Sequence, residues 1–185
     1  MMERDTSRRG IKVWDLLVRI GHWTLVISIA AAWLTRHGAG KWHEWLGYAV
    51  LGVVTLRVMW GLVGSRYARF TQFVRSPVNT LHYTKQILDG NEPRHLGHNP
   101  LGGWMIVALI ITITGVCSSG WLYTTDQYWG VTWVEELHEG LTNFLLALVA
   151  LHIGGVVFSS WRHGENLVAA MIHGRKRAPG MRDIV

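Results

Sequence analysis

Residues 138–161 read HEGLTNFLLALVALHIGGVVFSSW, and this stretch decides how the whole chain is interpreted. Between Gly140 and Trp161 it contains no Asp, Glu, Lys or Arg, which leaves a segment long enough to cross a bilayer as a helix. The stretch nevertheless holds two histidines, His138 and His152. Because polar side chains are costly inside a bilayer, both histidines are candidates for a function.

Three other stretches have the length and the apolar character of membrane spans. A bilayer core about 30 Å thick needs roughly 20 mostly apolar residues in a helix. The four predicted spans cover about residues 16–34, 42–63, 101–123 and 141–161. The sequence therefore predicts an all-α protein, an integral membrane four-helix bundle in which residues 1–185 form one transmembrane domain.

The segment between the second and third spans, residues 65–100, is polar and basic. Prolines interrupt it, and we expect it to form a cytoplasmic loop. Several apolar side chains within this loop predict a short amphipathic helix: Phe73, Val74, Leu81, Ile87 and Leu88. Such a helix could rest on the membrane surface or pack against the protein, and the sequence supports both arrangements equally.

The composition excludes several classes of protein. The single cysteine, Cys117, cannot form an internal disulfide, and the chain has no C-x-x-C-H sequence for covalent attachment of haem. The formal net charge of +6 is compatible with nucleic-acid binding, but in a chain with membrane spans it is better explained by basic loops. We therefore expect contact with membrane lipid and no binding of nucleic acid.

The basic residues are distributed unevenly between the two sides of the predicted bundle. The two connections on one side carry only Arg36 and Lys41. The other side has many more: Arg4, Arg8, Arg9, Lys12, Arg66, Arg69, Arg75, Lys85, Arg94, Arg162, Arg175, Lys176, Arg177 and Arg182. By the positive-inside rule, both termini are predicted to be cytoplasmic in a multi-pass membrane protein.

Four histidines fall at two depths of the predicted bundle. His22 in the first span and His152 in the fourth both lie slightly to the cytoplasmic side of the middle. His43 and His138 both lie at the outer face, at the start of the second span and of the fourth helix. The fourteen residues from His138 to His152 correspond to about 40° less than four turns and to roughly 21 Å along a helix. One face of one helix thus contributes a histidine to each of two stacked sites.

Two imidazoles that face each other at one depth of a helix bundle suit the axial ligation of haem iron. The pattern predicts two haem b groups, the inner iron bound by His22 and His152 and the outer iron by His43 and His138. A lone histidine in a span is more often a hydrogen-bond partner between helices, but two level pairs are hard to explain in that way. A zinc site needs three or four ligands at one point, which the separated pairs do not provide.

Two further residues of the second span belong to the predicted haem sites. Arg57 lies fourteen residues after His43, so it points in a similar direction at about the depth of the inner haem. A buried arginine needs an anion, which a haem propionate would provide, although the long side chain could reach lipid phosphate instead. Gly47, one turn after His43, would let a helix or a flat macrocycle approach closely, and ordinary helix packing explains it as well.

From about Trp14 to Arg177, the chain resembles the bacterial cytochrome b-561 and nickel–iron hydrogenase b-type cytochrome family. The resemblance rests on five runs: IGHW at 20–23, HEWLGY at 43–48, LRVMW at 56–60, EELHE at 135–139 and ALH at 150–152. It implies two b haems, electron exchange with a quinone pool, a redox partner protein and a bacterial inner membrane. The larger hydrogenase subunits of the family have an additional helix, so a chain with four predicted spans is less expected to be a dedicated hydrogenase subunit.

Two functions follow from this interpretation. The leading one is electron transfer between quinone or quinol and a periplasmic redox protein such as a c-type cytochrome. The alternative is an enzyme known in the same family, a superoxide oxidase that passes the electron to quinone. The predicted outer face is acidic, which would repel an anionic substrate and attract a basic protein: it carries Glu44, Asp126, Glu135, Glu136 and Glu139.

Overall fold

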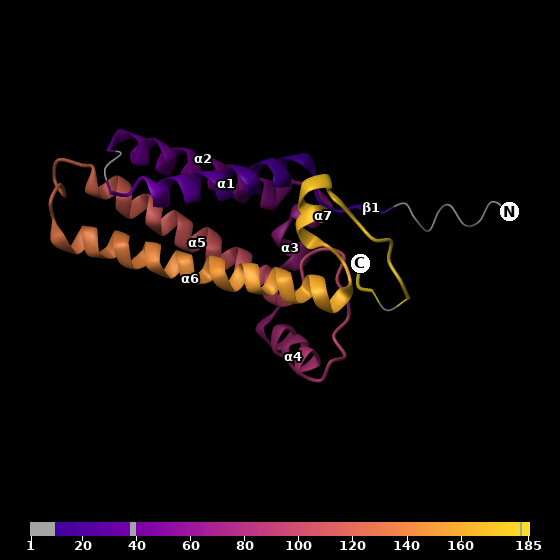
Figure 1. Ribbon diagram of the computed structural model, residues 1–185. Helices are drawn as coiled ribbons and strands as arrows, with labels where there is room; N and C mark the ends of the chain where they lie inside the picture. The colour runs from indigo at the N-terminus through magenta and orange to yellow at the C-terminus, as the bar shows by residue number, and fades with distance from the viewer. Residues whose placement is uncertain (1–9, 38–39, 182) are drawn as a thin grey trace. The chain divides into compact units, whose positions relative to one another are not determined.

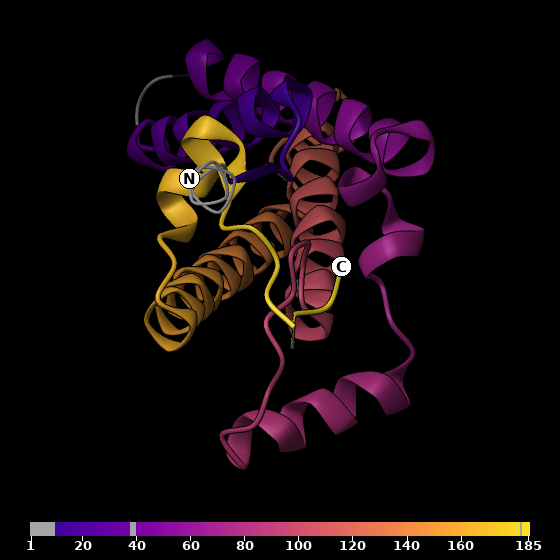
Figure 2. The same ribbon diagram turned by 90° about the vertical axis from the view of Figure 1, so that its right-hand side faces the viewer.

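Helices make up most of the computed structural model, which describes residues 10–37, 40–181 and 183–185 (Figure 1, Figure 2). Four helices are long and apolar enough to cross a membrane: α1 (Leu16–Leu34), α2 (Lys41–Val63), α5 (Pro100–Tyr123) and α6 (Thr132–His163). The predicted all-α membrane architecture is thereby confirmed.

The bounds of α1, α2 and α5 agree closely with the predicted spans, whereas α6 is longer. It begins at Thr132 rather than near Leu141. Its additional turns carry Glu135, Glu136 and Glu139, and these charges do not belong in an apolar span. A helix can continue beyond the bilayer into water, and Glu135 in the first turn interacts favourably with the helix dipole.

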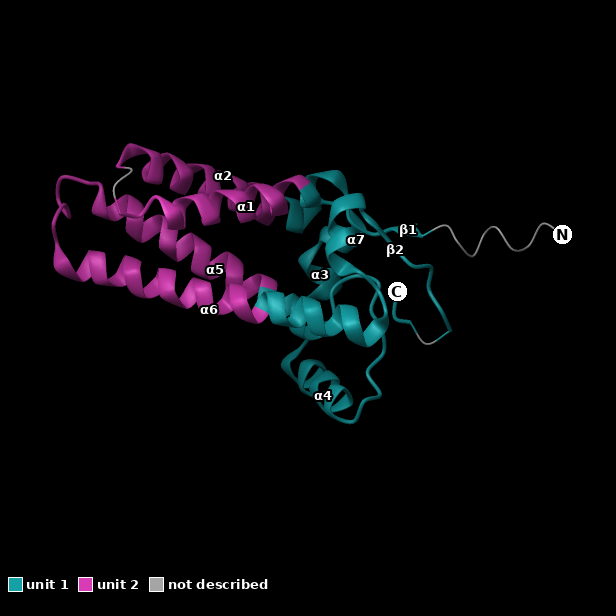
Figure 3. Cartoon of the chain, in the orientation of Figure 1, with its two compact units in different colours: residues 1–19, 60–105, 152–185 teal, residues 20–59, 106–151 magenta. Residues whose placement is uncertain are grey.

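The chain divides into two compact units (Figure 3). The bundle unit consists of residues 20–59 and 106–151. The tail unit consists of residues 1–19, 60–105 and 152–185, as far as they are described. Each of the four long helices has residues in both units.

Aliphatic side chains form the centre of the bundle unit. Val50 and Val54 of α2 are buried together with Ile113 of α5 and Leu145 of α6, and α1 packs against them through Ile29. Many other apolar side chains of these helices are exposed. Apolar surface of this extent is expected to face lipid, because soluble monomeric proteins rarely expose large apolar patches to water.

The tail unit contains the short elements that precede, connect and follow the long helices. Its helices are η2 (Arg66–Ala68), α3 (Phe70–Phe73), α4 (Pro77–Leu88) and α7 (Leu167–His173). Two short strands, β1 (Ile11–Lys12) and β2 (Arg175–Lys176), pair in antiparallel fashion. Segment 65–100 is therefore partly helical. Helix α4 contains Leu81, Ile87 and Leu88 of the predicted short helix, whereas Phe73 ends α3 and Val74 follows it with extended backbone.

Local sequence determines where two of these short helices begin and end. The Ser76 side chain caps α4 by accepting a hydrogen bond from the backbone N–H of Asn79 at 3.3 Å, and Pro77 occupies the first turn, where no N–H is needed. Asn166 caps α7 in the same manner. Helix α7 ends at His173 and is followed by Gly174, whose φ of +81° is a conformation that glycine adopts without strain.

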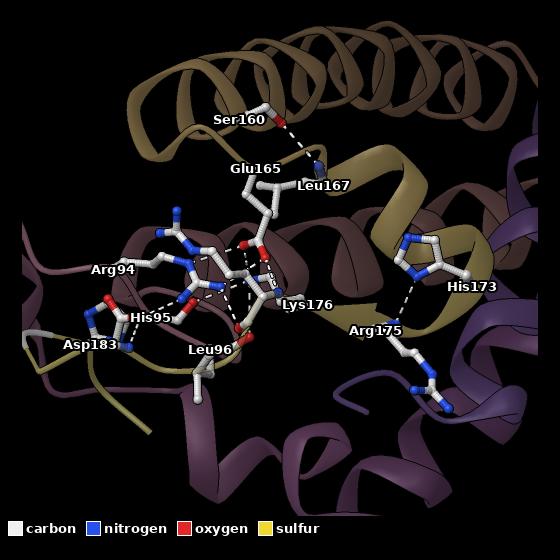
Figure 4. A network of polar contacts seen from close by, with 12 residues as sticks. Arg94, His95, Leu96, Ser160, Glu165, Leu167, His173, Arg175, Lys176 and Asp183 are labelled. Atoms are coloured by element: carbon white, nitrogen blue, oxygen red, sulfur yellow. Dashed lines mark hydrogen bonds and ion pairs between the residues drawn. The ribbon is translucent and has the colours of Figure 1, made fainter. Parts of the chain in front are cut away.

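A buried polar cluster, formed by Arg94, Glu165, Lys176 and Asp183, joins the C-terminal tail to the segment after α4 (Figure 4). Arg94 donates to Glu165 Oε1 at 2.8 Å and also to Asp183 Oδ2. The Arg94 side chain is only 4% exposed, so its charge depends on these two carboxylates. Lys176 Nζ donates to the backbone carbonyl of Leu96 at 3.0 Å and lies 3.8 Å from Glu165 Oε2.

Burial and ion pairing change the ionisation of this cluster in opposite directions. Burial lowers the pKa of Lys176 to about 8, because the charged ammonium is removed from water. Burial also acts to raise the pKa of Glu165, but hydrogen bonds from the Arg94 side chain and the Arg177 backbone outweigh it and hold that pKa below its usual value. The carboxylate therefore remains charged and compensates the buried cations.

Some of the residues behind the predicted orientation lie outside the described part of the chain, namely Arg4, Arg8, Arg9 and Arg182. The cytoplasmic location of both termini stays a prediction.

Candidate functional site

His43 of α2 and His138 of α6 face each other in the bundle unit. Their ring centroids are 6.2 Å apart, and the ring planes are inclined by 78°. Bonds of about 2 Å from one metal ion to two imidazole nitrogens place the ring centres roughly 6 Å apart. The separation is compatible with binding of one iron by both imidazoles.

A backbone carbonyl holds the Nδ1 atom of each of these two rings. His43 Nδ1 lies 3.0 Å from the carbonyl oxygen of Ala32 in α1, and His138 Nδ1 lies 3.0 Å from that of Val116 in α5. A carbonyl can only accept, so Nδ1 carries the proton and Nε2 keeps its lone pair. Metal-binding histidines are commonly oriented by this type of contact.

Helix α5 contributes two more residues to the surroundings of His138. Ser119 Oγ lies 3.2 Å from His138 Nδ1 and donates to the carbonyl of Val116 at 3.0 Å. A Cβ at Gly120 would lie 3.0 Å from His138 Cε1, so glycine leaves the ring the space it occupies. Neither residue is predicted from the sequence, because the third span has no histidine. Their small size, side by side at the depth of His138, is the signal that the sequence offers.

The second predicted pair is divided between the two units. His22 belongs to the bundle unit, where its ring meets that of Trp23 edge-on with centroids 5.2 Å apart. His152 lies in the tail unit, on the same helix as His138. The pairing of His22 with His152 stays a prediction.

The structure places the two remaining predicted site residues on α2. Arg57 is partly buried within the bundle unit. A Cβ at Gly47 would meet none of the described atoms within 4 Å, which leaves open space one turn after His43. This space is compatible with a flat macrocycle beside the His43 ring.

Within the part of the chain that the structure describes, His43 and His138 are not joined by further metal-ligating side chains. In the described ranges, no group of three or more His, Cys, Asp or Glu side chains is arranged to hold a metal ion. Zinc requires such a group, whereas haem iron needs only its axial ligands from the protein. The donor set at His43 and His138 thus fits haem better than zinc.

Exposed aromatic and acidic side chains lie close in sequence to His138. Trp129 and Trp133 are 69% and 53% exposed, and Trp133 packs edge-on against Tyr128 with ring centroids 5.9 Å apart. Asp126, Glu135, Glu136 and Glu139 are exposed as well. The bundle unit therefore presents a surface of aromatic residues with acidic neighbours at the end that holds His43 and His138.

The sequence is similar to known proteins over most of its length. Residues 13–174 match the family model described as prokaryotic cytochrome b561. The chain is also 24% identical over 223 residues to a probable Ni/Fe-hydrogenase B-type cytochrome subunit of Bradyrhizobium diazoefficiens, with 95% of this chain and 89% of that protein covered. No solved structure matches the chain.

Proposed function

The chain belongs to the prokaryotic cytochrome b561 family, and on this premise we propose that it is a di-haem cytochrome that carries electrons between the quinone pool and a periplasmic redox protein such as a c-type cytochrome. Family membership makes it a multi-pass membrane b-type cytochrome that takes part in electron transfer. The proposal adds the number of haems, the quinone as exchangeable substrate, and the partner.

The observation that carries the proposal is the geometry of His43 and His138. Their rings lie 6.2 Å apart, and a carbonyl holds Nδ1 of each ring. The Nε2 atoms of His43 and His138 would thus hold the iron of an outer haem. Gly47 leaves room beside it.

The inner haem is proposed from the register of α6. His138 and His152 lie on one continuous helix, so they face nearly the same way and are roughly 21 Å apart along its axis. His22 is the proposed partner of His152, and Arg57 is proposed to neutralise a propionate of the inner haem. These assignments rest on the depth of each residue in its span.

Haem bound at these sites would supply one-electron redox chemistry at its iron. The residues of the chain have other tasks. The Ala32 and Val116 carbonyls keep the proton of each outer ligand at Nδ1, and the apolar helices exclude water from the site. Arg57 would place a positive charge near the inner site and so favour the reduced form there.

The outer surface supports a basic protein as partner and disfavours superoxide, the substrate of the alternative enzyme function. Exposed acidic groups attract a basic surface and repel a small anion. Trp129 and Trp133 would serve as aromatic anchors within that acidic rim. A position at the membrane interface would also explain both indoles. Kinetic measurements with a protein partner distinguish the two explanations.

Stopped-flow measurements of reduced protein with a basic c-type cytochrome test this docking. Neutralising Glu135 and Glu136 should slow the reaction with the cytochrome and leave the reaction with quinone unchanged. The rates are compared at low salt, because screening limits the reach of charges to about 8 Å near physiological salt. Asp89→Asn, an exposed substitution in the tail unit, is the matched control. Wild-type rates in the double variant would contradict docking, and fast haem reduction by superoxide would support the oxidase instead.

We also propose that both termini are cytoplasmic, which places the connection between α5 and α6 in the periplasm. In a variant without Cys117, a cysteine at exposed Gln127 should react with an impermeant reagent added to intact cells. A cysteine at exposed Asn91 should be protected. The reverse labelling pattern would contradict the proposed orientation.

A further inference from the structure

Three of the four Val, Leu and Ile side chains of helix α4 are exposed, and the fourth, Ile87, is half-buried. Val78, Leu81 and Leu88 are 76%, 61% and 81% exposed, whereas Tyr83 is only 4% exposed. At about 100° per residue, the three aliphatic side chains form a stripe roughly 80° wide, and Tyr83 lies half a turn away from its middle. A helix that packs its apolar face on a protein would show the opposite pattern.

The N-terminal end of α4 is attached to the beginning of α5. Trp104 Nε1 donates to the backbone carbonyl of Arg75 at 3.1 Å, two residues before Pro77. Trp104 lies in the first turns of the span and is 40% exposed. Tryptophan at the end of a span prefers the membrane–water interface, so the start of α4 is held near that level.

The C-terminal end of α4 is attached to the end of α6. Arg162 Nη2 donates to the carbonyl of Gly90 at 2.6 Å, and Arg162 Nε donates to Glu92 Oε1 at 2.6 Å. Arg162 directly follows Trp161, which is 77% exposed at the end of the span. Both ends of α4 are therefore fixed at ends of spans on the same side of the membrane.

These two attachments determine how α4 lies. A helix of 12 residues is about 18 Å long, and one held at interface level at both ends must run along the membrane surface. Figure 2 shows α4 extended across the view and joined to the rest of the tail unit by extended segments. Its exposed stripe is then in a position to enter the headgroup region.

Lys85 lies inside the same stripe as Val78 and Leu81, and its side chain is exposed. A lysine among apolar residues can lay its aliphatic stem on the acyl boundary and extend its ammonium group to a phosphate. Exposed Arg66, Arg69 and Arg75 in the preceding segment add positive charge, against Asp89 at the end of the helix. This excess of positive charge is complementary to an anionic leaflet.

We propose that α4 is a membrane-surface helix that binds anionic phospholipid, with Val78, Leu81 and Leu88 inserted at the interface and Lys85 bound to a lipid phosphate. This inference requires the membrane location of the chain but neither haem nor redox partner.

Spin labels test the insertion of α4 in the full-length protein. In a Cys117→Ala background, labels at Leu81 and Leu88 are compared with a label at Asn91, which is exposed in the turn after α4. In phosphatidylcholine vesicles containing phosphatidylglycerol, the two helix labels should be more accessible to oxygen than to a water-soluble nickel complex, and Asn91 should show the reverse. Preferential access of nickel to Leu81 and Leu88 would overturn the proposal. Low access of both reagents, as expected for a protein contact, would overturn it as well.

Lipid selectivity tests the role of Lys85. Spin-labelled phosphatidylglycerol should associate with wild-type protein several-fold more than spin-labelled phosphatidylcholine does. Lys85→Gln should reduce this preference, and Lys41→Gln, an exposed substitution at the opposite end of the spans, should not. Retained haem content and helicity show that a variant is folded. An unchanged preference in folded Lys85→Gln would refute the anionic lipid site.

Discussion

The His43–His138 pair and the polar cluster both consist of partly or fully buried ionisable side chains, but their polar atoms have different kinds of partner. In the polar cluster, Arg94 meets Glu165 and Asp183, so charges are neutralised within the chain. In the histidine pair, a carbonyl engages Nδ1 of each ring and Nε2 keeps its lone pair. The charges of the cluster are compensated within the chain, whereas the Nε2 atoms of the histidine pair are the proposed ligands of haem iron.

Removal of a ligand from the pair should have the largest effect. His138→Ala should remove the outer haem and with it about half of the haem in a purified preparation, because one axial ligand of that iron is lost. Pyridine haemochrome analysis per protein measures this loss. His37→Ala, a histidine in the outer loop, should keep both haems. A fully loaded His138→Ala protein would show that the pair does not bind haem.

Removal of a charge from the polar cluster should destabilise the tail unit without affecting the outer haem. Arg94→Met leaves Glu165 and Asp183 without their shared counter-ion, which costs about 3–5 kcal/mol when the charges stay buried. Thermal unfolding and limited proteolysis of the C-terminal tail measure this effect. Arg177→Met, at an exposed position nearby, is the control. Wild-type melting temperature and protease resistance of the C-terminal tail in Arg94→Met would contradict this prediction. Loss of the outer haem spectrum in that variant would contradict it as well.

Lys176 should make stability depend on pH in the alkaline range. Its pKa is about 8 in the folded chain and 10.5 ordinarily, so the unfolded state binds more protons between these values. The free energy of unfolding should therefore rise as pH increases from 8 to 10.5. Lys176→Met should flatten this part of the profile, measured as melting temperature against pH. A slope that persists in the variant would assign it to another group.

The two regions also differ in how well the sequence predicts them. The histidine pair is predictable because histidines stand out on apolar helices and helical spacing gives their depth. The polar cluster is not, because Arg94, Glu165 and Asp183 are far apart in the chain and resemble ordinary surface charges. Ser119 and Gly120 are not predicted, because small residues are common in membrane helices and neither residue type indicates contact with a histidine of another span. The length of α6 was missed because its acidic first turns lie beyond the apolar segment.

Substitution of Arg57 tests whether this side chain neutralises a propionate of the inner haem or contacts lipid phosphate. If Arg57 neutralises a propionate, Arg57→Gln removes a positive charge near the inner iron and favours the ferric form. The inner potential should then fall, by about 59 mV for each tenfold change in the equilibrium, while the outer one remains nearly constant. A potentiometric titration resolves the two haems. Equal shifts at both haems, or none, would indicate that Arg57 reaches lipid phosphate.

The smallest expected effect concerns Ser119, which distinguishes the surroundings of the two outer ligands. Its Oγ lies 3.2 Å from His138 Nδ1, next to the Val116 carbonyl, whereas a single carbonyl, that of Ala32, holds His43 Nδ1. An acceptor at Nδ1–H makes the imidazole a stronger electron donor, which stabilises ferric iron. Ser119→Ala removes one of two acceptors, so the outer potential should rise, by no more than about 40 mV for a hydrogen bond of about 1 kcal/mol.

Ser118→Ala is the matched control, because Ser118 is an exposed neighbour on the same helix. The rise should be accompanied by a change in the low-spin EPR signal of the outer haem, which a change in packing far from the iron would not produce. An unchanged potential and signal in Ser119→Ala would mean that the Val116 carbonyl alone determines the proton position on His138.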